Sequence, residues 1–158
     1  MTNPTAPGAR HATVVIEERP RGGVSASLPF DPAAAWGERE TYHVHGTLGR
    51  QPYRGALVED RDGWRLELGP SWCRAPGFGP GDEVELIVAP EGPQSTSMGE
   101  DVAAAFSREP EAARFFDSMP SFHRKNAARW LDAAKRPETR ARRVAEIVDA
   151  AQRRQRER

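Results

Sequence analysis

A chain of 158 residues, 37% of them hydrophobic and 29% charged, is long enough for one ordinary domain or two small modules. No stretch approaches the roughly 20 consecutive apolar residues of a membrane-spanning helix, and the only cysteine, Cys73, excludes a disulfide within the chain. The charges sum to zero, but the residues from Ser121 onward hold twelve basic and five acidic groups, and the rest of the chain holds eleven and eighteen.

This charge separation lets the two halves of the chain attract each other, or lets the basic half meet an acidic partner. We take attraction within the chain as the simpler interpretation. The composition predicts a soluble protein without membrane insertion, and the single cysteine is compatible with a reducing cytoplasm.

The first 90 residues have the pattern of a small β-domain. Residues 1–11 lack the basic start and apolar centre of a signal peptide, so we expect a disordered tail there. Short alternating or β-branched runs predict six strands, at residues 13–17, 24–28, 41–48, 53–58, 64–68 and 83–89. A single helical turn is expected at residues 31–36, a hairpin turn at Asp60-Arg61-Asp62-Gly63, and a short helix at residues 70–75. This spacing of strands and turns predicts a closed or nearly closed β-barrel over residues 12–90.

The second half of the chain has helical periodicity. Residues 91–99 form a linker rich in Pro, Gly, Ser and Thr, and a helical module is expected at residues 100–152. Its helices are predicted at residues 101–107, from Pro110, at 118–134 and from Pro137, before a frayed basic tail at 153–158. Within the third helix, Phe122, Asn126 and Trp130 share a stripe that we expect to face the core, and we expect Ala141 and Ala145 on the core stripe of the last helix.

Two motifs flank a junction segment, residues 134–140. They are Trp130-Leu131-Asp132-Ala133-Ala134-Lys135 and Glu138-Thr139-Arg140-Ala141-Arg142-Arg143. Together they resemble the signature of the YdeI/OmpD-associated family, also called bacteriocin-protection proteins. The N-terminal half is similar to the uncharacterised β-barrel module that often precedes this family, on the motifs His45-Gly46-Thr47, Pro52-Tyr53-Arg54-Gly55-Ala56-Leu57, Asp62-Gly63 and Gly81-Asp82-Glu83-Val84.

The resemblance implies an α+β fold, in which a small six-stranded Greek-key β-barrel is followed by a C-terminal helical module. It implies a cytoplasmic bacterial protein and a link to bacteriocin or envelope-stress tolerance, and it brings no reaction and no cofactor. Thr96-Ser97-Met98-Gly99 departs from the β-like run usual in the family, which predicts a looser linker than in relatives.

The junction segment has two interpretations. In the structural one, Lys135 and Arg136 complement a helix C-terminus, Glu138 and Thr139 open the next helix, and Arg140 and Arg143 cover Trp130 or bridge to the acidic barrel. In the functional one, Lys135, Thr139, Arg140 and Arg143 surround the free amides of the last helix and bind an anion or a partner. Helix capping explains most of these residues, and we favour the structural interpretation.

Other candidate sites carry weaker signals. His43 and His45 project from the same face of a strand and are weak candidates for metal ligands, but a third ligand is missing. Cys73 lacks a recognisable base, which favours a structural cysteine. The glycines at residues 77–81 lead into a strand, so they do not form a phosphate-binding loop. We predict no metal and no cofactor.

These observations favour a non-catalytic binding or accessory protein whose partner is an unknown protein or a small anionic ligand. The first alternative is nucleic-acid binding through the basic C-terminal helices; neutral overall charge and aromatic residues on core faces weigh against it. The second alternative is an enzyme with an anion pocket between the modules. The oligomeric state does not follow from the sequence.

Overall fold

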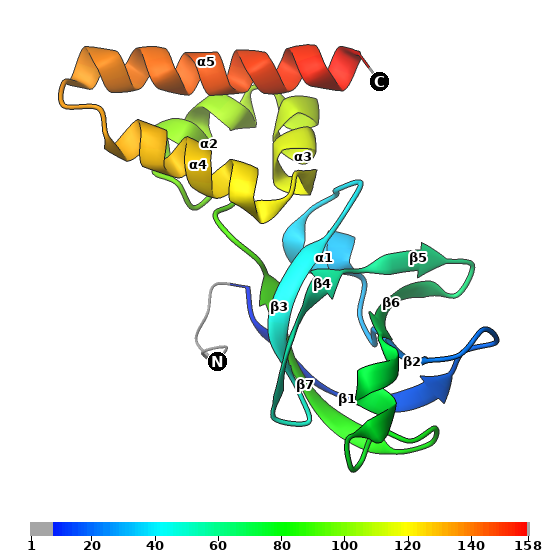
Figure 1. The fold of residues 1–158 in the computed structure, drawn as a ribbon. Helices are drawn as coiled ribbons and strands as arrows, with labels where there is room; N and C mark the ends of the chain where they lie inside the picture. Colours follow the sequence, from blue (N-terminus) through cyan, green and yellow to red (C-terminus); the bar gives the residue numbers. More distant parts are fainter. Residues whose placement is uncertain (1–7, 158) are drawn as a thin grey trace. The chain divides into compact units, whose positions relative to one another are not determined.

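The computed structural model describes residues 8–157 and confirms the α+β class (Figure 1). The chain divides into two compact units, each with its own core. The N-terminal unit comprises Met1–Gly37 and Tyr42–Pro90, and the C-terminal unit comprises Glu38–Thr41 and Glu91–Arg158. Of the tail predicted at residues 1–11, residues 1–7 lie outside the described residues, as does the side chain of Cys73. The prediction is wrong for Arg10 and His11, which are paired as part of the first strand of the N-terminal unit.

The N-terminal unit is built around one antiparallel sheet. Its strands are β1 (Arg10–Glu18), β2 (Val24–Ser27), β3 (His43–Leu48), β4 (Gln51–Ala56), β5 (Val58–Asp60), β6 (Gly63–Leu68) and β7 (Glu83–Pro90), in the order β4-β3-β7-β1-β2-β6-β5. A short helix, α1 (Pro32–Trp36), and a 3₁₀ helix, η1 (Pro70–Arg74), complete the unit. Its buried core includes Ile16, Val44, Leu66, Leu86 and Val88.

The sheet has seven strands, because the segment predicted as one strand at residues 53–58 is divided at Leu57 between β4 and β5. Leu57 is 5% exposed, and its amide donates a hydrogen bond to the Tyr42 carbonyl at 2.9 Å. The chain therefore leaves the ladder with β3 at Ala56 and joins β6 from Val58 onward. β4 and β5, the two ends of the sheet order, are thus joined by one buried residue.

Local sequence signals explain the turns of this unit. The two-residue turn Arg61-Asp62 confirms the predicted hairpin between β5 and β6, with Asp60 opposite Gly63. The Asp31 carboxylate accepts a hydrogen bond from the Ala33 amide at 3.0 Å and caps α1, as expected for an acidic N-cap. β1 begins earlier than predicted, at Arg10, because it pairs with β7 up to that residue.

The C-terminal unit consists of four helices. They are α2 (Glu100–Ser107), α3 (Pro110–Ser118), α4 (Ser121–Asp132) and α5 (Pro137–Arg156). Figure 1 shows α5 lying along the other three helices. Their core contains Val102, Phe106, Phe116, Leu131 and Val148, and the four-residue spacing of Val102 and Phe106 places both on one face of α2.

Some residues of α4 and α5 that the sequence predicts to face the core are exposed in the structure. In α4, Phe122 and Trp130 are exposed, and the buried residues are Ser121, Arg124 and Leu131. The helix is rotated because Arg124 turns inward, where it finds carbonyl partners. In α5, Val144, Val148 and Ala151 are buried, as their helical spacing predicts, whereas Ala141 and Ala145 of the same predicted stripe are exposed. The helix continues to Arg156 through part of the segment expected to fray.

Residues 91–99, predicted to be a linker, lie within the C-terminal unit. Ser95 is 3% exposed, and both its amide and its hydroxyl donate to the Asp117 carboxylate at 2.7 Å. The Arg124 guanidinium donates to the Pro93 carbonyl at 2.6 Å. Two buried polar side chains of α3 and α4 thus fix this segment.

Candidate functional site

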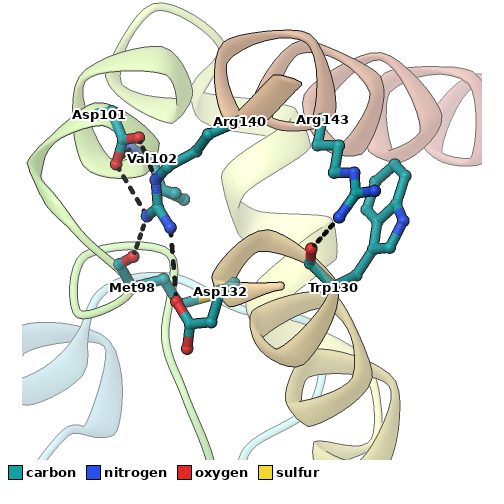
Figure 2. A network of polar contacts seen from close by, with 7 residues as sticks. All are labelled: Met98, Asp101, Val102, Trp130, Asp132, Arg140 and Arg143. Carbon is teal, nitrogen blue, oxygen red and sulfur yellow. Dashed lines mark hydrogen bonds and ion pairs between the residues drawn. The ribbon is translucent and has the colours of Figure 1, made fainter. Parts of the chain in front are cut away.

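Arg140 lies at the centre of a polar network within the C-terminal unit (Figure 2). Its Nε donates to Asp101 Oδ2 at 2.7 Å and its Nη1 to Asp132 Oδ1 at 3.4 Å. Its Nη2 donates to Asp101 Oδ1 and to the Met98 carbonyl, both at 3.2 Å. All three guanidinium nitrogens are therefore engaged, and the acids that engage them come from the helical unit, whereas the sequence suggested acids of the barrel.

This network shifts the pKa values of its members. Hydrogen bonding to Arg140 lowers the pKa of the Asp101 carboxyl below its usual range, against a smaller opposing effect of partial burial. The same contact raises the pKa of Arg140. Both shifts favour the charged pair, which joins α5 to the first turn of α2.

Arg143 covers Trp130, as the structural interpretation of the junction predicts. Its guanidinium lies 5.0 Å from the centre of the indole ring, and its Nη1 donates to the Trp130 carbonyl at 2.6 Å (Figure 2). Stacking of this kind contributes roughly 0.5–1 kcal/mol at exposed sites. Because one ring face carries an arginine and Trp130 is 39% exposed, the pair presents both an aromatic and a cationic group to solvent.

Lys135 and Thr139 occupy the turn into α5. Lys135 is exposed, Thr139 is half-buried, and the N-cap Arg136 makes no side-chain capping hydrogen bond. Pro137 has no N–H group, and the Arg140 amide already bonds to the Arg136 carbonyl at 3.1 Å. The amides of Glu138 and Thr139 thus lack a partner within the helix. The Glu138 carboxylate lies in the same first turn, where its negative charge offsets the positive end of the helix dipole.

The exposed side of α4 is the feature that sequence reasoning missed. Phe122 is 58% exposed and Trp130 39%, and the His123 ring lies against Phe122 with 4.1 Å between ring centres. Lys125 and Arg129 are exposed on the same helix. Two exposed aromatic side chains therefore flank two exposed cations along α4, contrary to the expectation that the aromatic residues face the core.

The spacing of α4 offers a second stripe that could face the core. Arg124 lies seven residues before Leu131 and three before Ala127, which places it on the helix face with these apolar residues. Charged residues are rarely fully buried, so the arginine on that stripe makes it the less obvious core face. In the structure Arg124 is 1% exposed, and burial lowers its pKa while the nearby Asp117 carboxylate acts in the opposite direction.

The remaining candidates are not assembled into a site. His43 and His45 are half-buried in β3, opposite Ala56 and Arg54 of β4. Within residues 8–157 the structure forms no group of three or more His, Cys, Asp or Glu side chains arranged to hold a metal ion. The side chain of Cys73 is not among those described, so its predicted structural role stays a prediction.

Comparison with known proteins agrees with the two-unit architecture. Residues 97–154 match the family model described as bacteriocin-protection, YdeI or OmpD-associated, and residues 11–88 match a domain of unknown function, DUF1905. Both the helical junction motif and the barrel motifs lie inside these ranges, which confirms the resemblance. No curated protein matches the chain. Among the described helices, none has the length and apolar character needed to cross a membrane.

Proposed function

Because the chain joins a DUF1905 domain to a C-terminal domain of the bacteriocin-protection (YdeI or OmpD-associated) family, we propose that it is a non-catalytic, cytoplasmic binding protein in bacteriocin or envelope-stress tolerance. Its partner is an acidic protein. The binding surface is the exposed side of α4 with one arginine of α5, which we call the aromatic–cationic face: Phe122, Lys125, Asn126, Arg129, Trp130 and Arg143.

The exposure of two large aromatic side chains on one basic helix carries this proposal. Phe122 and Trp130 are the only large hydrophobic side chains of the described C-terminal unit that are classed as exposed. Exposed apolar groups rimmed by charged residues mark interaction sites, and Trp and Arg are the residue types that dominate binding energy. The net charge of +7 from Ser121 onward, twelve basic minus five acidic residues, favours an acidic partner.

The junction residues have two roles in this proposal, at the edge of the binding surface and in supporting it. We assign Lys135, Thr139 and Arg143 to the edge of the partner site, where an exposed cation and two free amides favour an anionic group. Arg140 supports the site from within, because its three nitrogens hold α5 to Asp101, Asp132 and Met98.

Partner capture and affinity measurement test the proposal. The double variant Phe122→Ser/Trp130→Ser is compared with wild type and with Val15→Ser, a control at an exposed apolar position of the N-terminal unit. We expect a captured acidic protein to bind the double variant at least about tenfold more weakly, as for loss of a hot-spot aromatic. Lys135→Ala/Thr139→Ala tests the junction edge separately. Undiminished affinity of the Phe122/Trp130 variant for every partner would refute the proposed surface.

Single-stranded nucleic acid is the second candidate, and the placement of two basic residues between two exposed aromatic residues on α4 favours it. Phe122 and Trp130 are eight residues apart, or about 12 Å along the helix axis, and Lys125 and Arg129 lie between them. Bases stack on exposed aromatic rings while phosphates contact neighbouring cations. Fluorescence anisotropy of a labelled oligonucleotide decides this: binding that weakens steeply with salt and with Trp130→Ser supports it, and no binding at low salt rejects it.

We also infer that the N-terminal sheet corresponds to the six-stranded Greek-key barrel implied by the resemblance. β4 and β5 are consecutive in the chain and occupy the two ends of the sheet order, so they count as one bent strand. Amide hydrogen exchange tests this. Protection that runs without a break through Leu57 supports one continuous strand, and a rapidly exchanging Leu57 amide contradicts it.

A further inference from the structure

The helical unit contains a groove where α3, α4 and α5 meet, with a volume of about 200 Å³. Its floor is apolar and buried: Phe116 is 1% exposed, Ala151 3% and Phe115 8%. Half-buried Met119 and Ile147 form its walls. None of these residues belongs to the aromatic–cationic face, and the two features adjoin where the His123 ring, which lines the groove, lies against Phe122.

Small side chains keep this groove open. Ala127 of α4 and Ala150 and Ala151 of α5 line it, at positions where larger apolar residues would fill the space between three packed helices. Apolar cavities of about 150 Å³ are known to hold a molecule the size of benzene, whereas sites for drug-sized ligands occupy roughly 300–1,000 Å³. The groove therefore suits a short aliphatic chain and is too small for the apolar face of a helical peptide.

Two basic side chains define the polar end of the groove. Arg154 and His123 line it, and both are exposed, in contrast to its floor. Within residues 8–157, Arg154 forms no ion pair with an acid, although its neighbour Arg153 is paired with Asp149 at 3.1 Å. An apolar groove that ends at an unpaired arginine is complementary to a molecule with an apolar chain and one carboxylate.

We propose that the groove between α3, α4 and α5 binds a short aliphatic carboxylate. The chain occupies the space over Phe115, Phe116 and Ala151, and the carboxylate accepts hydrogen bonds from Arg154 and from a ring N–H of His123. The guanidinium offers paired N–H donors that match the two carboxylate oxygens. The inference extends beyond the proposed partner binding and does not depend on it.

The test uses the full-length protein with sodium octanoate, octanol and octylammonium as probes. Binding of each probe is monitored by ¹H–¹⁵N NMR. We expect octanoate to shift amides of residues 115–127 and 147–154 in a saturable way, with a Kd of about 1 mM for a ligand of about ten non-hydrogen atoms. Octanol should bind about tenfold more weakly because it lacks the charge-assisted contact, and octylammonium more weakly still.

Matched variants of α5 distinguish the effect of changes in the groove from the effect of the same changes elsewhere on the helix. Ala150→Leu fills the groove and should abolish the shifts, whereas Ala145→Leu, the same change at an exposed position, should leave them intact. Arg154→Glu should weaken octanoate binding at least about tenfold, with Arg142→Glu as the exposed control on the same helix. Because Arg154 is exposed, its variant tests the site even if Ala150→Leu perturbs packing.

Several outcomes overturn the inference. They are no saturable shift with octanoate up to about 10 mM, equal affinity for octanoate and octylammonium, and undiminished binding by Ala150→Leu. Tighter binding of an acidic peptide with a single leucine anchor would assign the groove to a protein segment. None of these outcomes bears on Phe122 or Trp130, so this inference and the proposed function can fail independently.

Discussion

Among single residues, Arg124 decides how residues 91–99 lie within the C-terminal unit. It is 1% exposed, its Nη1 donates to the Pro93 carbonyl at 2.6 Å, and its Nε donates to the Met119 carbonyl at 3.0 Å. A buried guanidinium is tolerated only where its donors are satisfied, and here backbone carbonyls satisfy them.

Replacing this arginine should destabilise the C-terminal unit. Arg124→Met keeps much of the apolar stem but removes the donors to the part-buried Pro93 and Met119 carbonyls, so we expect the free energy of unfolding to fall by roughly 2–4 kcal/mol. Urea denaturation measures the change. Arg129→Met, the same substitution at an exposed position of α4, is the control and should cost less than about 0.5 kcal/mol. Equal effects of the two substitutions would show that the Arg124 contacts contribute nothing specific.

The phenol of Tyr53 gives the N-terminal unit a dependence on alkaline pH. Burial raises the pKa of Tyr53 from 10.0 to about 12, and the nearby Glu67 carboxylate acts in the same direction. Since the folded-state pKa is the higher one, the contribution of Tyr53 to stability is fully present below pH 10 and is lost as pH rises through about 12.

Spectrophotometric titration near the tyrosinate absorbance band tests this dependence, together with denaturation curves at increasing pH. We expect Tyr53 to ionise near pH 12 in the folded protein, and Tyr53→Phe to remove that step and reduce the loss of stability at alkaline pH. Ionisation of every tyrosine near pH 10 in the folded protein would contradict the burial argument.

Between secondary-structure elements, Gly46 sets how closely β3 approaches β7. A Cβ atom at this position would lie 1.8 Å from the Ile87 carbonyl oxygen, so the two strands can pair as they do only with glycine here. Gly46→Ala should therefore separate the strands and reduce the free energy of unfolding by about 3 kcal/mol or more.

Gly69→Ala is the matched control for this prediction. Gly69 has φ −68°, and a Cβ there would meet no atom within 4 Å. Thermal or urea unfolding should therefore show little change for Gly69→Ala and a large loss for Gly46→Ala. A Gly46→Ala variant of wild-type stability would mean that β3 and β7 are not held at this spacing.

The contact between α5 and α2 depends on Arg140 and Asp101. Both side chains are partly exposed, at 28% and 46%, so solvent screens the pair, and we expect a double-mutant cycle with alanine to give a coupling of about 0.5–1 kcal/mol. Because the folded-state pKa of Asp101 is depressed, this contribution is present above the ordinary carboxyl pKa of 3.8 and is lost as pH falls through the lower folded-state value.

Urea denaturation at neutral pH and at pH values below 3.8 measures this coupling. It should decrease with acid and with added salt. Asp149 and Arg153, an exposed pair one turn apart on α5, form the comparison, and their coupling should be only about 0.3–0.5 kcal/mol. A coupling between Arg140 and Asp101 that is unchanged by acid would contradict the assigned ion pair.

At the scale of the whole molecule, each unit has its own hydrophobic core. The buried residues of the sheet and those of the helices form separate clusters. We therefore expect denaturation in more than one step, with Gly46→Ala lowering the stability of the N-terminal unit and Arg124→Met that of the C-terminal unit. Hydrogen exchange monitored residue by residue distinguishes the two units. Equal loss of protection in both units from either substitution would show that the chain unfolds as one cooperative body.

Several elements follow from local patterns in the sequence. The hairpin at Asp60 to Gly63, the Asp31 cap of α1 and the buried pair Val102 and Phe106 in α2 each depend on residues close together in the chain. Such signals act over a few residues, so propensity and spacing suffice to predict them. The family resemblance is equally a property of short motifs, and both matches confirm it.

The exposed face of α4 was not predictable in the same way. Periodicity identifies the helix, but two stripes compete for the core, one with Phe122 and Trp130 and one with Arg124 and Leu131. The choice depends on the carbonyls of Pro93 and Met119, since they satisfy the guanidinium once the chain is folded. The partners of Arg140 were not predictable for the same reason, because Asp101 lies 39 residues away in the chain and meets Arg140 only once the unit is folded.

The sequence by itself determined the α+β class, the division into a β-rich and a helical half, and the basic character of the latter. Patterning, turn residues and charge counts are local or additive properties, which is why they could be read directly. Only the tertiary structure decided that Arg140 is bound to its own acids, that Phe122 and Trp130 face solvent, and that three alanines leave a groove. These features depend on which distant groups meet, and that depends on packing the whole chain.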